Sequence, residues 1–120
     1  MRDPLAPAKK RTHGELKKAV MIACNRLPGV FLFPAGSGAL HAGGRFIRFG
    51  MVGVSDLVGW TMRPSPGGAF RYPVFTALEI KIGKDTLSPE QRAFLEKVRE
   101  AGGIGLEVRS VEDAVKALGG

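Results

Sequence analysis

The segment TALEIKI, residues 76–82, forms most of the stretch 74–82, which carries the strongest strand signal in the chain. Side chains alternate between the two faces of a strand, so its large aliphatic residues are expected to point together into a core. Glu79 and Lys81 are expected to point the other way, with about 7 Å between them. Burying such charges is costly without a partner or a metal ion. The segment alone still fits an ordinary amphipathic strand, because residues 15–17 repeat the Glu-x-Lys pattern by chance.

A second acid changes this balance. Asp56 lies 23 residues before Glu79 (79 − 56), inside the apolar stretch GVSDLVGW at residues 53–60, which we expect to be a strand. Two carboxylates facing each other across adjacent strands, together with the backbone carbonyl of Ile80, would make an all-oxygen site suited to Mg²⁺ or Mn²⁺. Lys81 beside them would orient, or help to deprotonate, a water that attacks a phosphodiester.

The rest of the pattern places this centre in a mixed α/β architecture. Residues 1–11 are expected to form a flexible basic arm, and residues 12–120 one domain. The Gly-rich stretch at 36–44 predicts a mobile or turning segment, and the Pro- and Gly-rich stretch at 63–73 predicts a loop. The order of elements predicts a mixed β-sheet flanked by helices. Strands are expected at 30–33, 46–49, 53–60, 74–82 and 104–108, and helices near 12–27, 88–101 and 110–118.

Charge and composition indicate a nucleic-acid partner. Lys and Arg total 18 against 11 acids, giving a net charge of +7. Such a surface attracts phosphate polyanions, although many basic proteins are merely kept soluble by their charge. Cys24 is the only cysteine, so no internal disulfide or structural zinc site is expected, and a reducing cytoplasm fits best. No apolar run reaches the length of about 20 residues that a membrane helix needs.

The acids and their surroundings together resemble a known family. The stretch GVSDLVGW (53–60) followed by LEIK (78–81) resembles the PD-(D/E)XK nuclease superfamily, and its VRR-NUC branch (virus-type replication-repair nucleases) in particular. The likeness extends over about residues 12–118. It is carried by the order and spacing of weak motifs, which also include RFIRFG (45–50), LSPEQRAFL (87–95), AGG (101–103) and VRSVEDA (108–114).

The resemblance implies a restriction-endonuclease-like fold and cleavage of DNA with a divalent metal. By position, Asp56 and Glu79 would be metal ligands and Lys81 the catalytic lysine. Glu15 would be the acid of the first helix, acting through water, and Gln91 would support the site or contact DNA. The chain looks like the stand-alone phage or bacterial form, which implies branched, flap or Holliday-junction DNA, a homodimer, and the cytoplasm of a bacterial or phage-infected cell.

Two of these residues have a structural alternative. Glu15 completes a capping box with Thr12, and Gln91 completes one with Ser88. Capping alone would explain either residue. For both, the sequence leaves a structural role and a role in the site open.

Several other side chains are candidates for contacts with DNA or a metal. Arg45 and Arg48 are expected to touch phosphates, although strand edges often carry arginine for solubility. Trp60 could stack on a base, but packing near the site is favoured. His13 and His41 have no partner at metal-ligand spacing and are interpreted as surface residues.

The sequence therefore predicts a metal-dependent DNA endonuclease. The alternatives are a DNA-binding module that has lost turnover, and an enzyme that acts on RNA. The stretch at 63–73 would be an insertion that modifies substrate access. The apolar run 30–33 with the Gly-rich segment after it would form the dimer interface, or else be buried in the sheet of the monomer.

Overall fold

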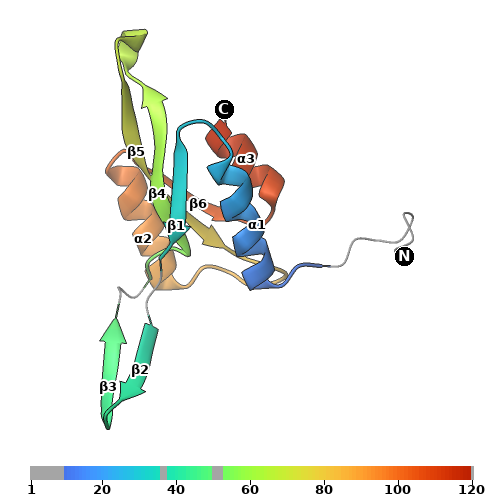
Figure 1. The fold of residues 1–120 in the computed structure, drawn as a ribbon, viewed down its shortest axis with the longest axis vertical. Coiled ribbons are helices and arrows are strands. Elements are labelled where there is room, and N and C mark those ends of the chain that lie inside the picture. The colour runs from blue at the N-terminus through green and yellow to red at the C-terminus, as the bar shows by residue number, and fades with distance from the viewer. Residues whose placement is uncertain (1–9, 36–37, 50–52, 120) are drawn as a thin grey trace, which may run out of the picture.

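The computed structural model describes residues 10–35, 38–49 and 53–119. The predicted basic arm at 1–11 falls almost entirely outside the described residues. The elements, in chain order (Figure 1), are α1 (His13–Asn25), β1 (Val30–Pro34), β2 (Gly38–Ala42), β3 (Arg45–Phe49), β4 (Leu57–Pro64), the 3₁₀ helix η1 (Pro66–Gly68), β5 (Arg71–Ile80), α2 (Pro89–Glu100), β6 (Ile104–Val108) and α3 (Val111–Gly119).

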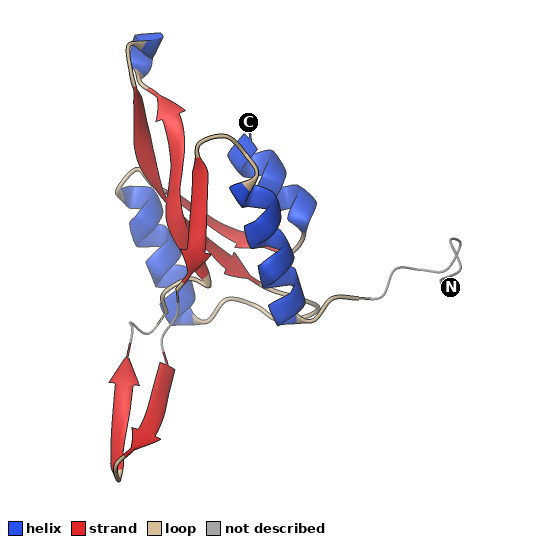
Figure 2. Ribbon diagram, in the orientation of Figure 1, coloured by secondary structure: helices blue, strands red, loops and turns tan. Residues whose placement is uncertain are grey.

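A four-stranded mixed sheet forms the centre of the described part of the chain. Its order is β1-β4-β5-β6, in which β1, β4 and β5 are antiparallel neighbours and β6 runs parallel to β5. The parallel pair is joined through α2, as a crossover connection requires. Helices α1 and α3 pack together on one face of the sheet and α2 lies on the other (Figure 2). The predicted fold class, a restriction-endonuclease-like mixed sheet flanked by helices, is confirmed.

Strand β5 shows the alternation predicted for residues 76–82. Leu78 and Ile80 are fully buried in the cluster formed with α1 and α3, and Ile82 packs against it from beyond the strand end. Ala77 is buried on the opposite face, under α2. Glu79 therefore shares the α2 face, as expected from the two-residue period.

Three expectations about strands need correction. The strand expected at 53–60 begins only at Leu57, so Asp56 lies in a bend just before β4. The stretch 63–73 is largely not a loop, because β4 and β5 continue through it and pair up to Pro64 and Arg71 around η1. The run 30–33 is buried on one face only, since its side chains alternate between buried and exposed along β1.

The Gly-rich stretch after β1 contains regular structure where it is described. Strands β2 and β3 pair antiparallel in a two-stranded sheet of their own, with Gly43 and Gly44 at its turn. Both glycines have positive φ, at 56° and 74°, a region that side chains with a Cβ rarely adopt. Figure 1 shows this hairpin apart from the main sheet.

The helices begin and pack as their sequences predict. Ser88 caps α2, and Ser110 accepts a hydrogen bond from the Asp113 amide at the start of α3. Cys24 is fully buried on α1 as a thiol of the core, and burial raises the pKa of this thiol to about 11. In the described residues, none of the helices combines the length and apolarity needed to cross a bilayer.

Candidate active site

The two acids meet where β4 begins and β5 ends. Leu57 pairs with Leu78, so the same register continued by one residue sets Asp56 opposite Glu79 (56 + 79 = 57 + 78). The Asp56 carboxylate turns onto the end of β5, where its Oδ2 atom accepts a hydrogen bond of 2.9 Å from the Ile80 amide. Sheet pairing therefore assembles two carboxylates that are far apart in sequence.

Glu79 is a buried acid with one unpartnered oxygen. The residue is only 3% exposed. Its Oε1 atom accepts a hydrogen bond of 2.9 Å from the Gln91 side-chain amide, whereas Oε2 is buried and has no hydrogen-bond partner. Burial, and next the neighbouring Asp56 carboxylate, raise the pKa of Glu79 to about 7, while Lys81 acts in the opposite direction. Such a group needs a proton or a cation to offset the cost of its burial.

Lys81 completes the charged group from the position directly after β5. Its Nζ atom lies 3.9 Å from Glu79 Oε1, which is an electrostatic contact longer than a hydrogen bond. The side chain is 14% exposed. Its backbone amide donates to the Val108 carbonyl on β6, which fixes the strand end from which the side chain projects. A mostly buried lysine side chain is thus held beside Glu79.

Gln91 combines the two roles that the sequence left open. Its Oε1 atom accepts a hydrogen bond from the Ser88 amide, and the Ser88 hydroxyl accepts one from the Gln91 amide, which completes the capping box of α2. The other end of the same side-chain amide donates to Glu79. The first turn of α2 therefore orients the carboxylate of Glu79.

His13 is the site residue that sequence reasoning missed. Its Nε2 atom lies 3.2 Å from Asp56 Oδ2 and 3.1 Å from the Ile80 carbonyl oxygen. The side chain is 43% exposed, which agrees with the interpretation of His13 as a surface residue, but the sequence did not predict its contacts with Asp56 and Ile80. The start of α1 carries the imidazole to the end of β5, and no local pattern in the sequence shows that contact.

Glu15, the predicted acid of the first helix, contributes to a capping box. Its carboxylate accepts a hydrogen bond of 2.9 Å from the Thr12 amide, and the Thr12 hydroxyl accepts one from the Glu15 amide. The residue is exposed on the first turn of α1. The structural role that the sequence offered is therefore present, and its role in catalysis stays a prediction.

Two predicted phosphate contacts, and the histidine interpreted as a surface residue, lie on the hairpin. Arg45 and Arg48 belong to β3, and His41 belongs to β2. Their side chains fall outside what the structure describes, so their roles stay predictions.

The donor atoms near the acids suit a hard cation. Asp56 Oδ2 and the Ile80 carbonyl oxygen converge on one nitrogen of His13, and Glu79 contributes the buried, unpartnered Oε2. Among the described residues, no three His, Cys, Asp or Glu side chains are grouped closely enough to hold a metal by themselves. A cation would therefore also need the backbone carbonyl and water, which is usual for Mg²⁺.

Comparison with known families identifies the same region. The family model for the VRR-NUC domain matches residues 42–113 of the 120-residue chain. The matched segment contains Asp56, Glu79, Lys81 and Gln91, and it begins after α1 and β1. No curated protein and no solved structure matches the chain.

Proposed function

Because the chain belongs to the VRR-NUC family of nuclease domains, which act on DNA, we propose that it hydrolyses DNA phosphodiester bonds with a divalent cation. The observation that carries this proposal is the buried Glu79 carboxylate, whose Oε2 has no partner and lies beside a second acid. Burying a carboxylate with one oxygen unsatisfied beside a second acid is unfavourable for folding, and such buried, perturbed acids are typical of functional sites.

The side chains of the site divide into cation ligands and supporting groups. Asp56, Glu79 and the Ile80 carbonyl would hold Mg²⁺ or Mn²⁺, for which oxygen ligands are suited. When bound, the cation would stabilise the negative charge that develops on the phosphate. Gln91 fixes Glu79 through a hydrogen bond of 2.9 Å, and His13 positions Asp56 and the carbonyl.

Lys81 would act on the attacking water. Its ammonium lies beside Glu79 at the edge of the site and keeps partial access to solvent. From there it would orient a water toward the phosphorus and stabilise charge in the transition state. This role differs from that of the acids, because it concerns turnover rather than cation binding.

We extend the proposal to branched or flap DNA and to a homodimer. One chain supplies one copy of the site, and symmetric cutting of two strands requires two copies related by a two-fold axis. In light scattering, a dimer would give twice the chain mass of 12.8 kDa. Val30 and Leu32 are buried within the chain's own sheet, so the run 30–33 offers a partner only its outward side chains.

The test is a cleavage assay on single-stranded, duplex, flap and four-way DNA with Mg²⁺, Mn²⁺ or EDTA. Cleavage should require the cation, and Mn²⁺ should restore activity after chelation. Lys81→Ala should lower turnover by roughly a hundredfold or more and leave DNA affinity almost unchanged. Undiminished cutting in EDTA would refute the metal proposal. Tight binding of DNA without cleavage by the wild type would favour a binding module that has lost turnover.

A further inference from the structure

A row of exposed aromatic side chains crosses the sheet on the face that carries the acids. Phe31 on β1 pairs in register with Trp60 on β4, which pairs with Phe75 on β5. The three residues are 48%, 42% and 48% exposed, and Phe33 beside them is 43% exposed. The Phe31 and Trp60 rings are stacked with their centroids 5.0 Å apart. We call these four residues the aromatic row.

The aromatic row lies at a fixed distance from the catalytic acids. Trp60 follows Asp56 by four residues, and Phe75 precedes Glu79 by four. Along β5, four residues span about 13 Å, and Phe75 and Glu79 share a face because they are an even number of residues apart. Between the aromatic row and the acids lie Val58 and Ala77, which face each other across β4 and β5 and are buried under α2. One sheet face thus presents the acids at one end and a wide aromatic surface at the other.

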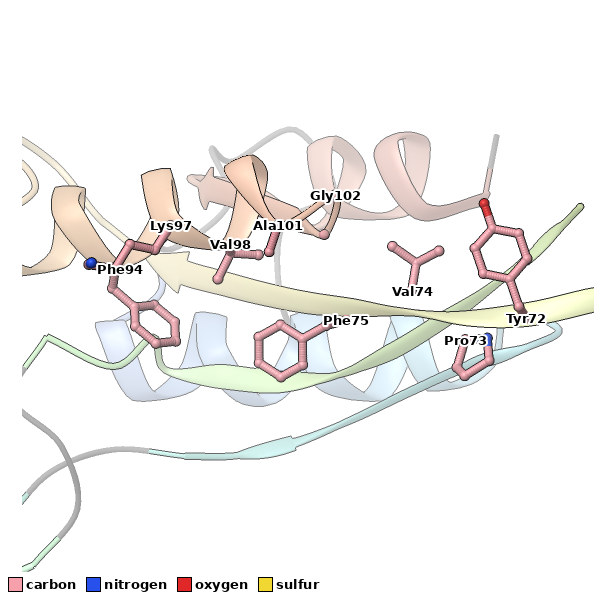
Figure 3. Close-up of a pocket in the computed structure, with 10 residues that line it drawn as sticks. Tyr72, Pro73, Val74, Phe75, Phe94, Lys97, Val98, Ala101 and Gly102 are labelled. Atoms are coloured by element: carbon pink, nitrogen blue, oxygen red, sulfur yellow. The ribbon is translucent and has the colours of Figure 1, made fainter. Parts of the chain in front are cut away.

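The surroundings of the aromatic row suit a polyanion. The three strands that carry it contain no acidic residue except Glu79, which belongs to the site. Phe75 also lines an open groove of about 490 Å³ against α2, together with Phe94 and Lys97 (Figure 3). Lys97 thus lines the same groove as Phe75, on a chain of net charge +7.

The exposed rings are too small a surface to hold a second copy of the chain by themselves. An aromatic residue buries roughly 150–250 Å² when fully covered, so four residues less than half exposed offer roughly 400 Å². A stable interface buries about 800 Å² on each partner. Base stacking needs only the faces of single rings, and neighbouring basic groups supply the attraction to phosphate.

We propose that the aromatic row binds unpaired bases of single-stranded DNA and so guides the strand toward Asp56 and Glu79. Bases inside a duplex are stacked on each other, so their faces cannot pack on the rings, whereas a flap or gap exposes them. The aromatic row would hold nucleotides roughly 13 Å from the scissile phosphate. The inference rests on the proposed nuclease function for its purpose, but the binding itself does not require cleavage.

The test uses the intact protein in EDTA, where cutting is not expected. Trp60 is the only tryptophan of the chain, so its fluorescence reports on the aromatic row directly. The probe is an oligothymidylate of about 12 nucleotides, a length within the site sizes of about 4–16 nucleotides known for single-strand-binding domains. We expect it to quench Trp60, and Phe31→Leu and Phe75→Leu to weaken binding roughly 5- to 100-fold each.

Phe70→Leu is the matched control, because Phe70 is 63% exposed at the tip of the β4–β5 hairpin and pairs with Tyr72 rather than with the aromatic row. This variant should bind like the wild type. Affinity unchanged in both row variants, or Trp60 fluorescence unchanged by the oligonucleotide, would overturn the proposal. So would a fall in light-scattering mass from dimer to monomer in the row variants, since the face would then contact a second copy.

The result separates this inference from the proposed function. If the wild type cuts no DNA but oligothymidylate still quenches Trp60, the nuclease proposal fails and the binding site stands. If DNA is cut but Trp60 does not respond, only the binding site fails. Should a leucine variant fail to fold, as judged by circular dichroism, quenching of Trp60 in the wild type decides the question.

Discussion

Two regions of one sheet face each contain side chains in an environment that is unusual for their type. At one end, Glu79 buries a carboxylate beside Asp56 with one oxygen unpartnered. At the other end, Trp60 and Phe75 expose aromatic rings to solvent. Charged groups are rarely buried without a partner, and large exposed apolar patches usually mark an interaction site. In sequence, Trp60 lies four residues from Asp56, and Phe75 lies four residues from Glu79.

The opposite face of the same strands shows what folding alone would produce. There, Leu78 and Ile80 are fully buried beneath α1 and α3. Even the buried hydroxyls of Thr61 and Thr76 are paired with each other, at 2.8 Å. Both faces carry a buried core, but only the α2 face combines it with a buried, partly unsatisfied acid and exposed aromatic rings. Substitutions at the two ends of the α2 face should therefore affect stability and binding in different ways.

The largest stability effect is expected from Glu79→Gln. With a chelator present at pH 8, this substitution removes a buried charge and keeps an oxygen for the Gln91 hydrogen bond. The free energy of unfolding should rise by about 3 kcal/mol, since the pKa of Glu79 is raised from 4.5 to about 7 and one pKa unit corresponds to about 1.36 kcal/mol. Chemical denaturation measures the change. Glu107→Gln is the control. Glu107 lies opposite Glu79 in the backbone register of β6 and β5, but it is exposed.

The gain in stability from Glu79→Gln should depend on pH. Burial raises the pKa of Glu79 from 4.5 to about 7, so the folded protein holds the proton more tightly than the unfolded chain does. The cost of the buried charge is absent below pH 4.5, grows as the pH rises toward 7, and is constant above that value. The gain from Glu79→Gln should follow the same curve. An equal gain at pH 4 and pH 8 would contradict a cause in the charge.

A smaller effect, on cation affinity, is expected from His13→Ala. The imidazole contacts both Asp56 and the Ile80 carbonyl, and its loss should weaken Mn²⁺ binding about tenfold because the two oxygens are no longer held together. Glu15→Gln, two residues along the same helix, is the comparison. Calorimetric titration measures both variants. If Glu15→Gln weakens Mn²⁺ binding and His13→Ala does not, the acid of the first helix, rather than the histidine, serves the site.

The parts of the site that could be predicted from the sequence depend on the two-residue period of a strand, on strand pairing and on a local capping motif. The two-residue period of β5 separates Glu79 from Leu78 in any sheet, so its face was predictable. The facing of Asp56 and Glu79 followed once their strands were assumed to be neighbours. The capping box of Ser88 and Gln91 is a local pattern and needs no tertiary contact.

The errors concern long-range placement and strand ends. His13 reaches Asp56 across 43 residues of sequence because α1 packs on the sheet, which local spacing cannot encode. The hairpin through 63–73 was hidden by its prolines and glycines, which are typical of loops. The run 30–33 is aliphatic and aromatic throughout, so its apolarity gave no sign that Phe31 and Phe33 face solvent.

The central claim is that Asp56 and Glu79 hold a divalent cation at the DNA-cleaving site. The most direct test is a calorimetric titration of Mn²⁺ into Lys81→Ala protein bound to flap DNA, where slow turnover keeps the substrate intact. One ion should bind per chain, and adding Asp56→Asn should weaken that binding at least tenfold, because one of two charged ligands is lost. Mn²⁺ binding of equal affinity and stoichiometry with and without the Asp56 carboxylate would contradict the account.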